Sequence, residues 1–228
     1  MTPPPPFIGR VKELEDLELL FKKNSASLVV VQGRRRIGKS RLIQEFGKNH
    51  RYYFFSGLPP DKRTTAQKQR NEFARQMGDF FGLQGLKSDD WATLFTLLAA
   101  QVQQNKTIIL FDEISWMGSK DSSFLGKLKN AWDLYFKQNS QLIFVLCGSI
   151  SPWIEKNILS STGFLGRISL ILYLQELSLQ ECTLFLSKQG RELEAYEQLK
   201  ILCLTGGIPR YLEEIQKSMT AEENIKRL

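Results

Sequence analysis

The chain has 228 residues, a hydrophobic fraction of 42% and a charged fraction of 24%. These values are typical of a folded globular protein, and they exclude a disordered, collagen-like or fibrous chain. The 31 Lys and Arg residues exceed the 24 Asp and Glu residues, so the net charge is +7, which leaves a nucleic-acid partner open.

Three features of the sequence bear on where the protein works. The longest apolar runs, such as residues 107–111 and 142–147, are far below the roughly 20 residues of a membrane-spanning helix. The N-terminus has neither the charged segment nor the apolar segment of a secretory signal. Cys147, Cys182 and Cys203 lack metal-like spacing and favour reduced core thiols. We therefore expect a cytoplasmic protein with no membrane partner.

The first half of the chain predicts helices alternating with strands. Residues 3–6 are prolines, which favour an extended leader because proline fits neither a helix interior nor a sheet interior. Apolar residues in 11–21 recur with the spacing of an amphipathic helix. Further strands are expected at residues 28–32 and 52–56, and further helices at 39–46, 66–81 and 89–104.

The second half changes character after residue 175. Strands are expected at residues 107–111, 141–147 and 169–174, with a helix at 124–136, whereas helices alone are expected at 178–188, 193–204 and 208–218. Apolar strands alternating with helices predict an α/β fold in three layers, with a parallel sheet between helices. We expect a core at residues 1–175 and a small helical lid at 176–228. The lid ends abruptly for a helical bundle, so a fragment of a longer protein is an open alternative.

A glycine-rich loop follows the first expected strand and opens a helix. Residues 33–40 match the pattern G-x-x-x-x-G-K-[ST] of phosphate-binding loops. Glycines allow backbone N–H groups to face phosphate oxygens, Lys39 reaches the β and γ phosphates, and the Ser40 hydroxyl binds Mg²⁺. The residues expected to contact ATP or ADP here are Gly33, Arg34, Arg35, Arg36, Ile37, Gly38, Lys39, Ser40 and Arg41. The arginine side chains at 34–36 are expected to point away from the phosphates, toward solvent, a partner subunit or nucleic acid.

Two carboxylates close the apolar strand at residues 107–111. Carboxyl ends of parallel strands meet at the edge of the sheet where nucleotides bind, so Asp112 is expected to hold Mg²⁺. Glu113 is the candidate general base that polarises the attacking water, and its alternative is a solvated residue that starts a loop. The 73 positions from Lys39 to Asp112 leave room for an intervening strand. Ser149 then ends an adjacent strand, where it either orients water or contacts the γ phosphate, or simply forms a turn with Gly148.

Several motifs together resemble a known family. They are Phe7-Ile8-Gly9-Arg10 with Glu13, the loop at 33–40, Leu-Phe-Asp-Glu at 110–113, and the segments 163–167 and 205–211. In this combination the chain resembles the archaeal and bacterial ATPases of the STAND branch of the AAA+ superfamily. The resemblance implies the strand order 5-1-4-3-2, a helical lid and a nucleotide between core and lid. It also implies relatives among origin-recognition and signalling ATPases.

The resemblance further implies roles for residues outside the glycine loop. Phe7, Ile8 and Gly9 are expected to line the adenine, and Pro209 to pack on the base from the lid. Arg167 or Arg210 is implied as a γ-phosphate sensor or arginine finger, acting on its own nucleotide or on a neighbour's. The alternatives for the lid residues are structural, since proline favours the first position of a helix and an arginine beside it can be solvated.

The leading functional hypothesis is an Mg²⁺-dependent ATPase that acts as a conformational switch with slow hydrolysis. Its partner would be another protein or a C-terminal effector domain absent from this sequence, and the oligomeric state stays open. One alternative is a DNA-binding ATPase related to origin-recognition loaders. Another is a nucleotide-binding module without useful turnover.

Overall fold

A computed structural model describes residues 6–227 of the chain. Its centre is a parallel sheet in the order β2-β3-β4-β1-β5, which confirms the predicted order 5-1-4-3-2. The strands are β1 (Ser27–Gly33), β2 (Arg51–Ser56), β3 (Thr107–Asp112), β4 (Leu142–Ser149) and β5 (Ile168–Leu174). The proline leader lies outside the described residues except for Pro6, which is exposed.

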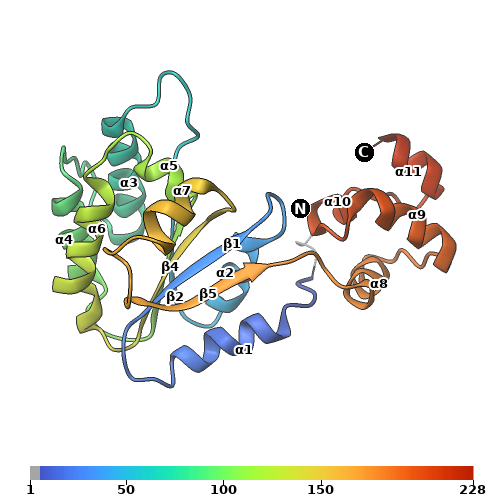
Figure 1. The fold of residues 1–228 in the computed structure, drawn as a ribbon, viewed down its shortest axis with the longest axis horizontal. Helices are drawn as coiled ribbons and strands as arrows, with labels where there is room; N and C mark the ends of the chain where they lie inside the picture. The colour runs from blue at the N-terminus through green and yellow to red at the C-terminus, as the bar shows by residue number, and fades with distance from the viewer. Residues whose placement is uncertain (1–5, 228) are drawn as a thin grey trace.

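Helices cover both faces of the sheet, so the predicted three-layer α/β class is confirmed (Figure 1). Side chains alternate along each strand, and Leu28 and Val30 therefore join one core cluster while Val29 and Val31 join the other. The second cluster is completed by α1 (Val11–Leu20) and α2 (Lys39–Gly47). The first is completed by α3 (Ala66–Phe81), α4 (Trp91–Gln101), α5 (Ile114–Gly118), α6 (Phe124–Leu134), α7 (Pro152–Ile154) and the short turns η1 (Phe136–Gln138) and η2 (Glu155–Leu159).

The helices after β5 gather at one end of the molecule (Figure 1). They are α8 (Leu179–Lys188), α9 (Ala195–Thr205), α10 (Pro209–Glu213) and α11 (Ala221–Arg227). They enclose a small core of their own, which includes Phe185, Ile201 and Leu212. We call residues 175–227 the lid, although the predicted domain boundary after residue 175 stays a prediction.

Two segments join the core to the lid: the residues before α1 and the first residues of α10. Phe7 packs against the α1–α2 side of the sheet, whereas the next residue, Ile8, packs against the lid core. From the lid, Ile208 and Tyr211 return to the α1–α2 cluster. The space between core and lid is therefore walled by both.

The expected elements differ from the observed ones mainly at their ends. The helix expected at 208–218 ends at Glu213, and α5, α7, η1, η2 and α11 were not expected because each is too short to show a helical period. Cys147 and Cys182 are buried as predicted, but Cys203 is exposed on α9, so its predicted core position is wrong. Among residues 6–227, no helix is both long and apolar enough to cross a membrane.

Candidate functional site

The glycine-rich loop connects β1 to α2 at the carboxyl edge of the sheet. Gly38 caps the start of α2 with φ 95, a left-handed backbone conformation that residues other than glycine rarely adopt. Gly33 has a different constraint, since an added Cβ would lie 2.9 Å from the backbone oxygen of Leu174 on β5. One glycine is thus required by backbone conformation and the other by close packing.

Lys39 is buried and turns its ammonium group back into the loop. Its Nζ donates hydrogen bonds to the backbone oxygens of Gly33 at 3.2 Å and Arg34 at 3.1 Å. Within residues 6–227 the group has no carboxylate in ion-pair distance, so its charge is uncompensated by the protein. An anion bound in the loop would supply that compensation.

Ser40 and Asp112 meet across the base of the loop. The Ser40 hydroxyl donates a hydrogen bond to Asp112 Oδ2 at 2.8 Å, although 72 positions separate the two residues. Hydroxyl and carboxylate oxygens suit Mg²⁺, which takes few protein ligands and completes its shell with phosphate oxygens and water. Residues 6–227 contain no cluster of three or more His, Cys, Asp or Glu that could hold a metal alone. The pair therefore fits Mg²⁺ bound together with a phosphate ligand.

Glu113 occupies a strained position directly after β3. Its φ is 52, in the left-handed region, and it precedes α5 without using its side chain as a cap. Burial raises the pKa of its carboxyl group and the neighbouring charge of Asp112 raises it further, while Lys39 and Arg35 act in the opposite direction. A carboxylate with a raised pKa beside two cations is suited to accept a proton from water.

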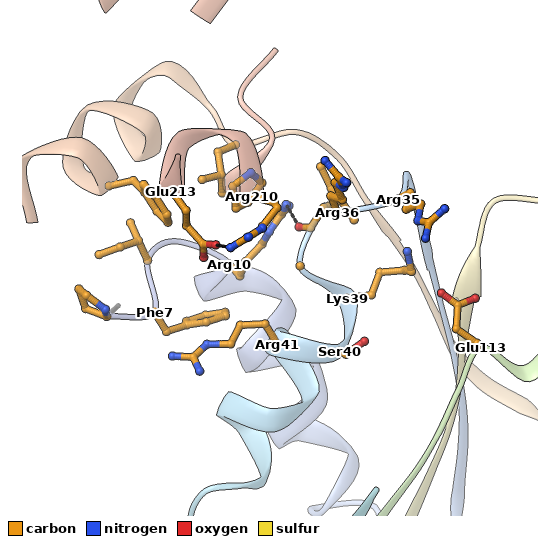
Figure 2. A pocket seen from close by; sticks show the side chains of 17 residues that line it. Phe7, Arg10, Arg35, Arg36, Lys39, Ser40, Arg41, Glu113, Arg210 and Glu213 are labelled. Carbon is orange, nitrogen blue, oxygen red and sulfur yellow. Dashed lines mark hydrogen bonds and ion pairs between the residues drawn. The ribbon is translucent and has the colours of Figure 1, made fainter. Parts of the chain in front are cut away.

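A cavity of about 510 Å³ lies between the loop, the N-terminal segment and the lid (Figure 2). One part of its lining is apolar and the other carries positive charge. The apolar residues are Pro6, Phe7, Ile8, Ile37, Leu177, Phe185 and Pro209. The charged and polar residues are Arg10, Arg35, Arg36, Lys39, Ser40, Arg41, Glu113, Arg210 and Glu213, with Gly38 beside them. This division suits a molecule with a flat apolar end and a polyanionic end.

Gly9 lies beside this cavity without lining it. Its φ is 73, and an added Cβ would meet Glu181 Oε1 of the lid at 2.2 Å. The same carboxylate oxygen accepts a hydrogen bond from the backbone N–H of Arg10 at 3.1 Å. The structure therefore gives Gly9 a close contact with the lid, and the adenine contact that the resemblance implied stays a prediction.

Two of the loop arginines contact the lid. Arg34 Nη1 forms an ion pair with Glu176 Oε1 at 3.0 Å, in the connection between β5 and α8. The guanidinium of Arg36 lies 5.5 Å from the centre of the Tyr211 ring on α10. Both contacts are within the same chain. Arg35 and Arg36 line the main cavity, whereas Arg34 does not, so the expectation that all three side chains point away from the phosphates stays a prediction.

Arg210 and Arg167 are both engaged by carboxylates. Arg210 lines the cavity, where it pairs with Glu213 at 2.8 Å and Glu214 at 2.7 Å. Arg167 pairs through two nitrogens with Asp133 of α6, at 2.9 and 2.8 Å. It immediately precedes β5, and its neighbour Ile168 aligns with the beginning of β1, about 20 Å along the sheet from the glycine loop. Arg167 thus lies away from the glycine loop of its own subunit, and its implied role as a sensor or arginine finger stays a prediction.

Ser149 lies close to Glu113 but outside the main cavity. It ends β4 opposite Gly33 of β1, and it lines a second, adjoining cavity. That cavity is formed by Arg34, Arg35, Glu113, Ser115, Trp116, Ser149, Ile150 and Ser151. Glu113 and Arg35 are shared by the two cavities, so Ser149 faces the same region from the far side.

Residues 7–215 match the ATPase domain found predominantly in Archaea. The chain belongs to this family. An uncharacterised protein of Methanocaldococcus jannaschii is 24% identical over 210 residues, which cover 92% of the chain and 44% of that relative. The chain thus spans less than half the length of this relative.

Solved structures with the same fold come from several archaeal ATPases of this kind. A Walker-type ATPase of Pyrococcus abyssi has a TM-score of 0.72 at 18% identity, covering 97% of this chain and 71% of its own. The ORC2 protein of Aeropyrum pernix, solved with ADPNP and ADP, has a TM-score of 0.67 at 14% identity. The match covers 100% of this chain and 70% of ORC2. A STAND protein of Pyrococcus horikoshii with a tetratricopeptide repeat sensor has a TM-score of 0.57 at 19% identity. The match covers 99% of this chain and 33% of the STAND protein. These likenesses confirm the expected family resemblance at the level of the fold.

Arg10 belongs to the first motif of the resemblance, but no role in the site was predicted for it from the sequence. It is 7% exposed and has φ 60, and its guanidinium donates to the backbone oxygens of Gln175 at 2.5 Å and Ile37 at 3.5 Å. It therefore joins the glycine loop to the start of the lid. The available signal was the Phe-Ile-Gly-Arg order together with Glu13, which pairs with Arg10 at 3.3 Å.

We expect Lys39→Ala to weaken ATP binding at least tenfold, or about 1.4 kcal/mol, because the uncompensated ammonium group is lost from the loop. Isothermal titration calorimetry measures the affinity. Lys48→Ala is the matched control, since Lys48 ends the same helix and pairs with Glu45 at 2.7 Å away from the cavity. Equal affinity in Lys39→Ala and wild type, with unchanged circular dichroism, would exclude the loop as the phosphate site.

We expect Gly9→Ala to lower the free energy of unfolding by about 1–2 kcal/mol or more, because alanine is strained at positive φ and its Cβ meets Glu181. Gly126→Ala is the control, since an added Cβ at this position in α6 meets nothing within 4 Å. Thermal unfolding should show a loss for the first variant and no loss for the second. Similar melting temperatures for both would show that the contact with Glu181 contributes nothing.

We expect Arg167→Ala to lower the denaturant concentration at the midpoint of unfolding at neutral pH, since it breaks a two-point ion pair. Hydrogen bonds from Arg167 and Lys129 hold the pKa of Asp133 well below its usual range. The contribution is therefore present above the unfolded pKa of about 4 and fades as the pH falls toward the folded pKa. Denaturant unfolding at pH 7 and pH 3 measures this. Unchanged stability with reduced ATPase activity would instead favour an arginine that acts on a neighbouring subunit.

Proposed function

We propose that this domain binds Mg-ATP between core and lid, hydrolyses it slowly, and switches the position of the lid according to the nucleotide bound. The observation that carries the proposal is the cavity itself, since its walls come from the loop, the N-terminal segment and the lid together. A ligand in that position contacts both bodies and can change their relative position. Membership of an ATPase family supports the chemistry.

The binding part of the proposal assigns the two ends of ATP to the two parts of the cavity. Phe7, Ile8 and Pro209 form an apolar slot in which an adenine ring would lie, while Lys39 and the loop amides would hold the phosphates. Ser40 and Asp112 would hold Mg²⁺, which neutralises phosphate charge when bound. Pro209 also occupies the first turn of α10, so a structural and a binding role coincide there.

The hydrolytic part rests on Glu113 and Ser149. Glu113 would accept a proton from the attacking water, because its carboxylate faces the loop cations and has a raised pKa. Ser149 would orient the water or contact the terminal phosphate from the adjoining cavity. The second carboxylate, Asp112, accepts the hydrogen bond of Ser40 and would serve as the metal ligand.

The switch part rests on contacts that join the glycine loop directly to the lid. Arg34 with Glu176 and Arg36 with Tyr211 join the loop to the lid directly. Arg10, from the N-terminal segment, joins them indirectly, since it donates to the backbone oxygens of Ile37 and Gln175. A change of loop conformation on phosphate binding would therefore strain or relieve these contacts. The partner that senses the lid would be another protein or the part of a longer parent that this chain does not include.

We expect Glu113→Gln to bind ATP as tightly as wild type but to hydrolyse it at least 100-fold more slowly, because an amide accepts no proton. Single-turnover assays with radiolabelled ATP measure the rate. Asp112→Asn is the contrasting variant and should weaken the dependence of binding on Mg²⁺. Wild-type turnover in Glu113→Gln would place the base elsewhere.

The same variant tests the switch. Cys203 is exposed on the lid, whereas Cys147 and Cys182 are buried, so a spin label at Cys203 can be paired with one at Ser119→Cys on the core. In Glu113→Gln, we expect the measured distance between labels to differ between ADP and Mg-ATP. Identical distances would leave a nucleotide-binding module without a switch. The DNA-binding alternative stays a prediction, since the likeness to ORC2 concerns the fold.

A further inference from the structure

The three consecutive arginines of the loop have three different environments. Arg34 is paired with Glu176, and Arg36 lies over the ring of Tyr211. Arg35 forms neither a hydrogen bond nor an ion pair with any residue in 6–227, and it is exposed. A guanidinium held by no protein group at the edge of an anion site is available to a ligand.

Arg35 faces the reaction region of the site. It lines both the main cavity and the adjoining one, and the only other residue common to both linings is Glu113. In Figure 2 the side chains of Arg35, Lys39 and Glu113 point toward the same space at one end of the cavity. A terminal phosphate held by Lys39, with water beside Glu113, would lie next to the guanidinium of Arg35.

The other arginines near the site are less available. Arg210 is held by the carboxylates of Glu213 and Glu214. Arg10 donates to the backbone oxygens of Ile37 in the loop and Gln175 after β5. Arg167 lies at the far end of the sheet with Asp133. Among these described residues, Arg35 alone combines proximity to Glu113 with freedom from a protein partner.

We propose that Arg35 is a catalytic residue that contacts the γ phosphate within its own subunit, an inference that rests on the proposed ATPase function. Glu113 accepts a proton from water as the water oxygen forms its bond to the γ phosphorus. The bond from that phosphorus to the bridging oxygen breaks, and ADP leaves with the electron pair, giving ADP and inorganic phosphate. Arg35 exchanges no proton and stabilises the charge on the equatorial oxygens.

The decisive measurement compares affinity for ADP with affinity for the non-hydrolysable triphosphate ADPNP, both with Mg²⁺, by calorimetry. Arg35→Ala should lower the affinity for ADPNP about tenfold or more, since a charge-assisted hydrogen bond to the γ phosphate is lost. Its affinity for ADP should change less than threefold. Arg51→Ala is the matched control, with the same charge change at the exposed start of β2 and outside the linings of both cavities, and should leave the ratio of the two affinities as in wild type.

Kinetics provide the second readout. We expect Arg35→Ala to slow single-turnover hydrolysis at least 100-fold, and Arg35→Lys to recover more of the ADPNP affinity than of the rate, because an ammonium cannot make the two-point contact of a guanidinium. If Arg35→Ala fails to fold by circular dichroism, the ratio of affinities in Arg35→Lys and Arg35→Gln replaces it.

The outcomes separate this proposal from the proposed function. If the wild-type protein binds both nucleotides but hydrolyses neither, the proposed ATPase function is overturned. The ratio of the affinities for ADPNP and ADP would still show whether Arg35 contacts the γ phosphate. Hydrolysis by wild type with an unchanged ratio in Arg35→Ala would overturn the contact alone. An equal change of the ratio in Arg51→Ala would also overturn it, because a general loss of positive charge would then explain the effect.

Discussion

The parallel pairing of β1 with strands on both sides is the constraint on which the site depends. Gly33 at the end of β1 aligns with Ser149 of β4 and with Leu174 of β5, and Asp112 ends β3 one strand further along. Because every strand runs in the same direction, the glycine loop, the carboxylates of Asp112 and Glu113, and the connection from β5 to the lid all lie at one edge of the sheet. The buried residues of β1 fix that arrangement, since a shift of its register by one residue would exchange its two core faces.

The connection between this edge and the lid consists of contacts of unequal strength. The exposed pair of Arg34 with Glu176 is worth about 0–1 kcal/mol, and the interaction of Arg36 with Tyr211 is of similar size. Arg10 is buried and binds two backbone oxygens, so its loss would leave polar groups without partners. In the proposed switch, weak outer contacts around the buried Arg10 would let the lid change position while it stays attached to the core.

The sequence was sufficient for features set by local pattern. Apolar runs of five or six residues identified all five strands, and glycine spacing identified the loop, because both signals lie within a few positions of the chain. Side-chain partners across long separations were not predictable in this way. Arg167 follows a flexible glycine-containing segment and resembles a mobile finger, yet Asp133, 34 positions earlier, holds it at the opposite edge of the sheet. Gly9 likewise owes its conformation to Glu181, 172 positions later, which no local pattern reveals.

The three loop arginines carry the same charge but have different surroundings. Arg34, Arg35 and Arg36 are equivalent in the sequence, and with Lys39 they supply part of the basic excess that leaves a nucleic-acid partner open. Arg34 and Arg36 contact the lid, whereas Arg35 lines both cavities together with Glu113. Such a concentration of positive charge is unfavourable unless an anion lies within it. A polyphosphate in the cavity would remove this repulsion, so binding, lid contact and catalysis would all draw on the same short segment.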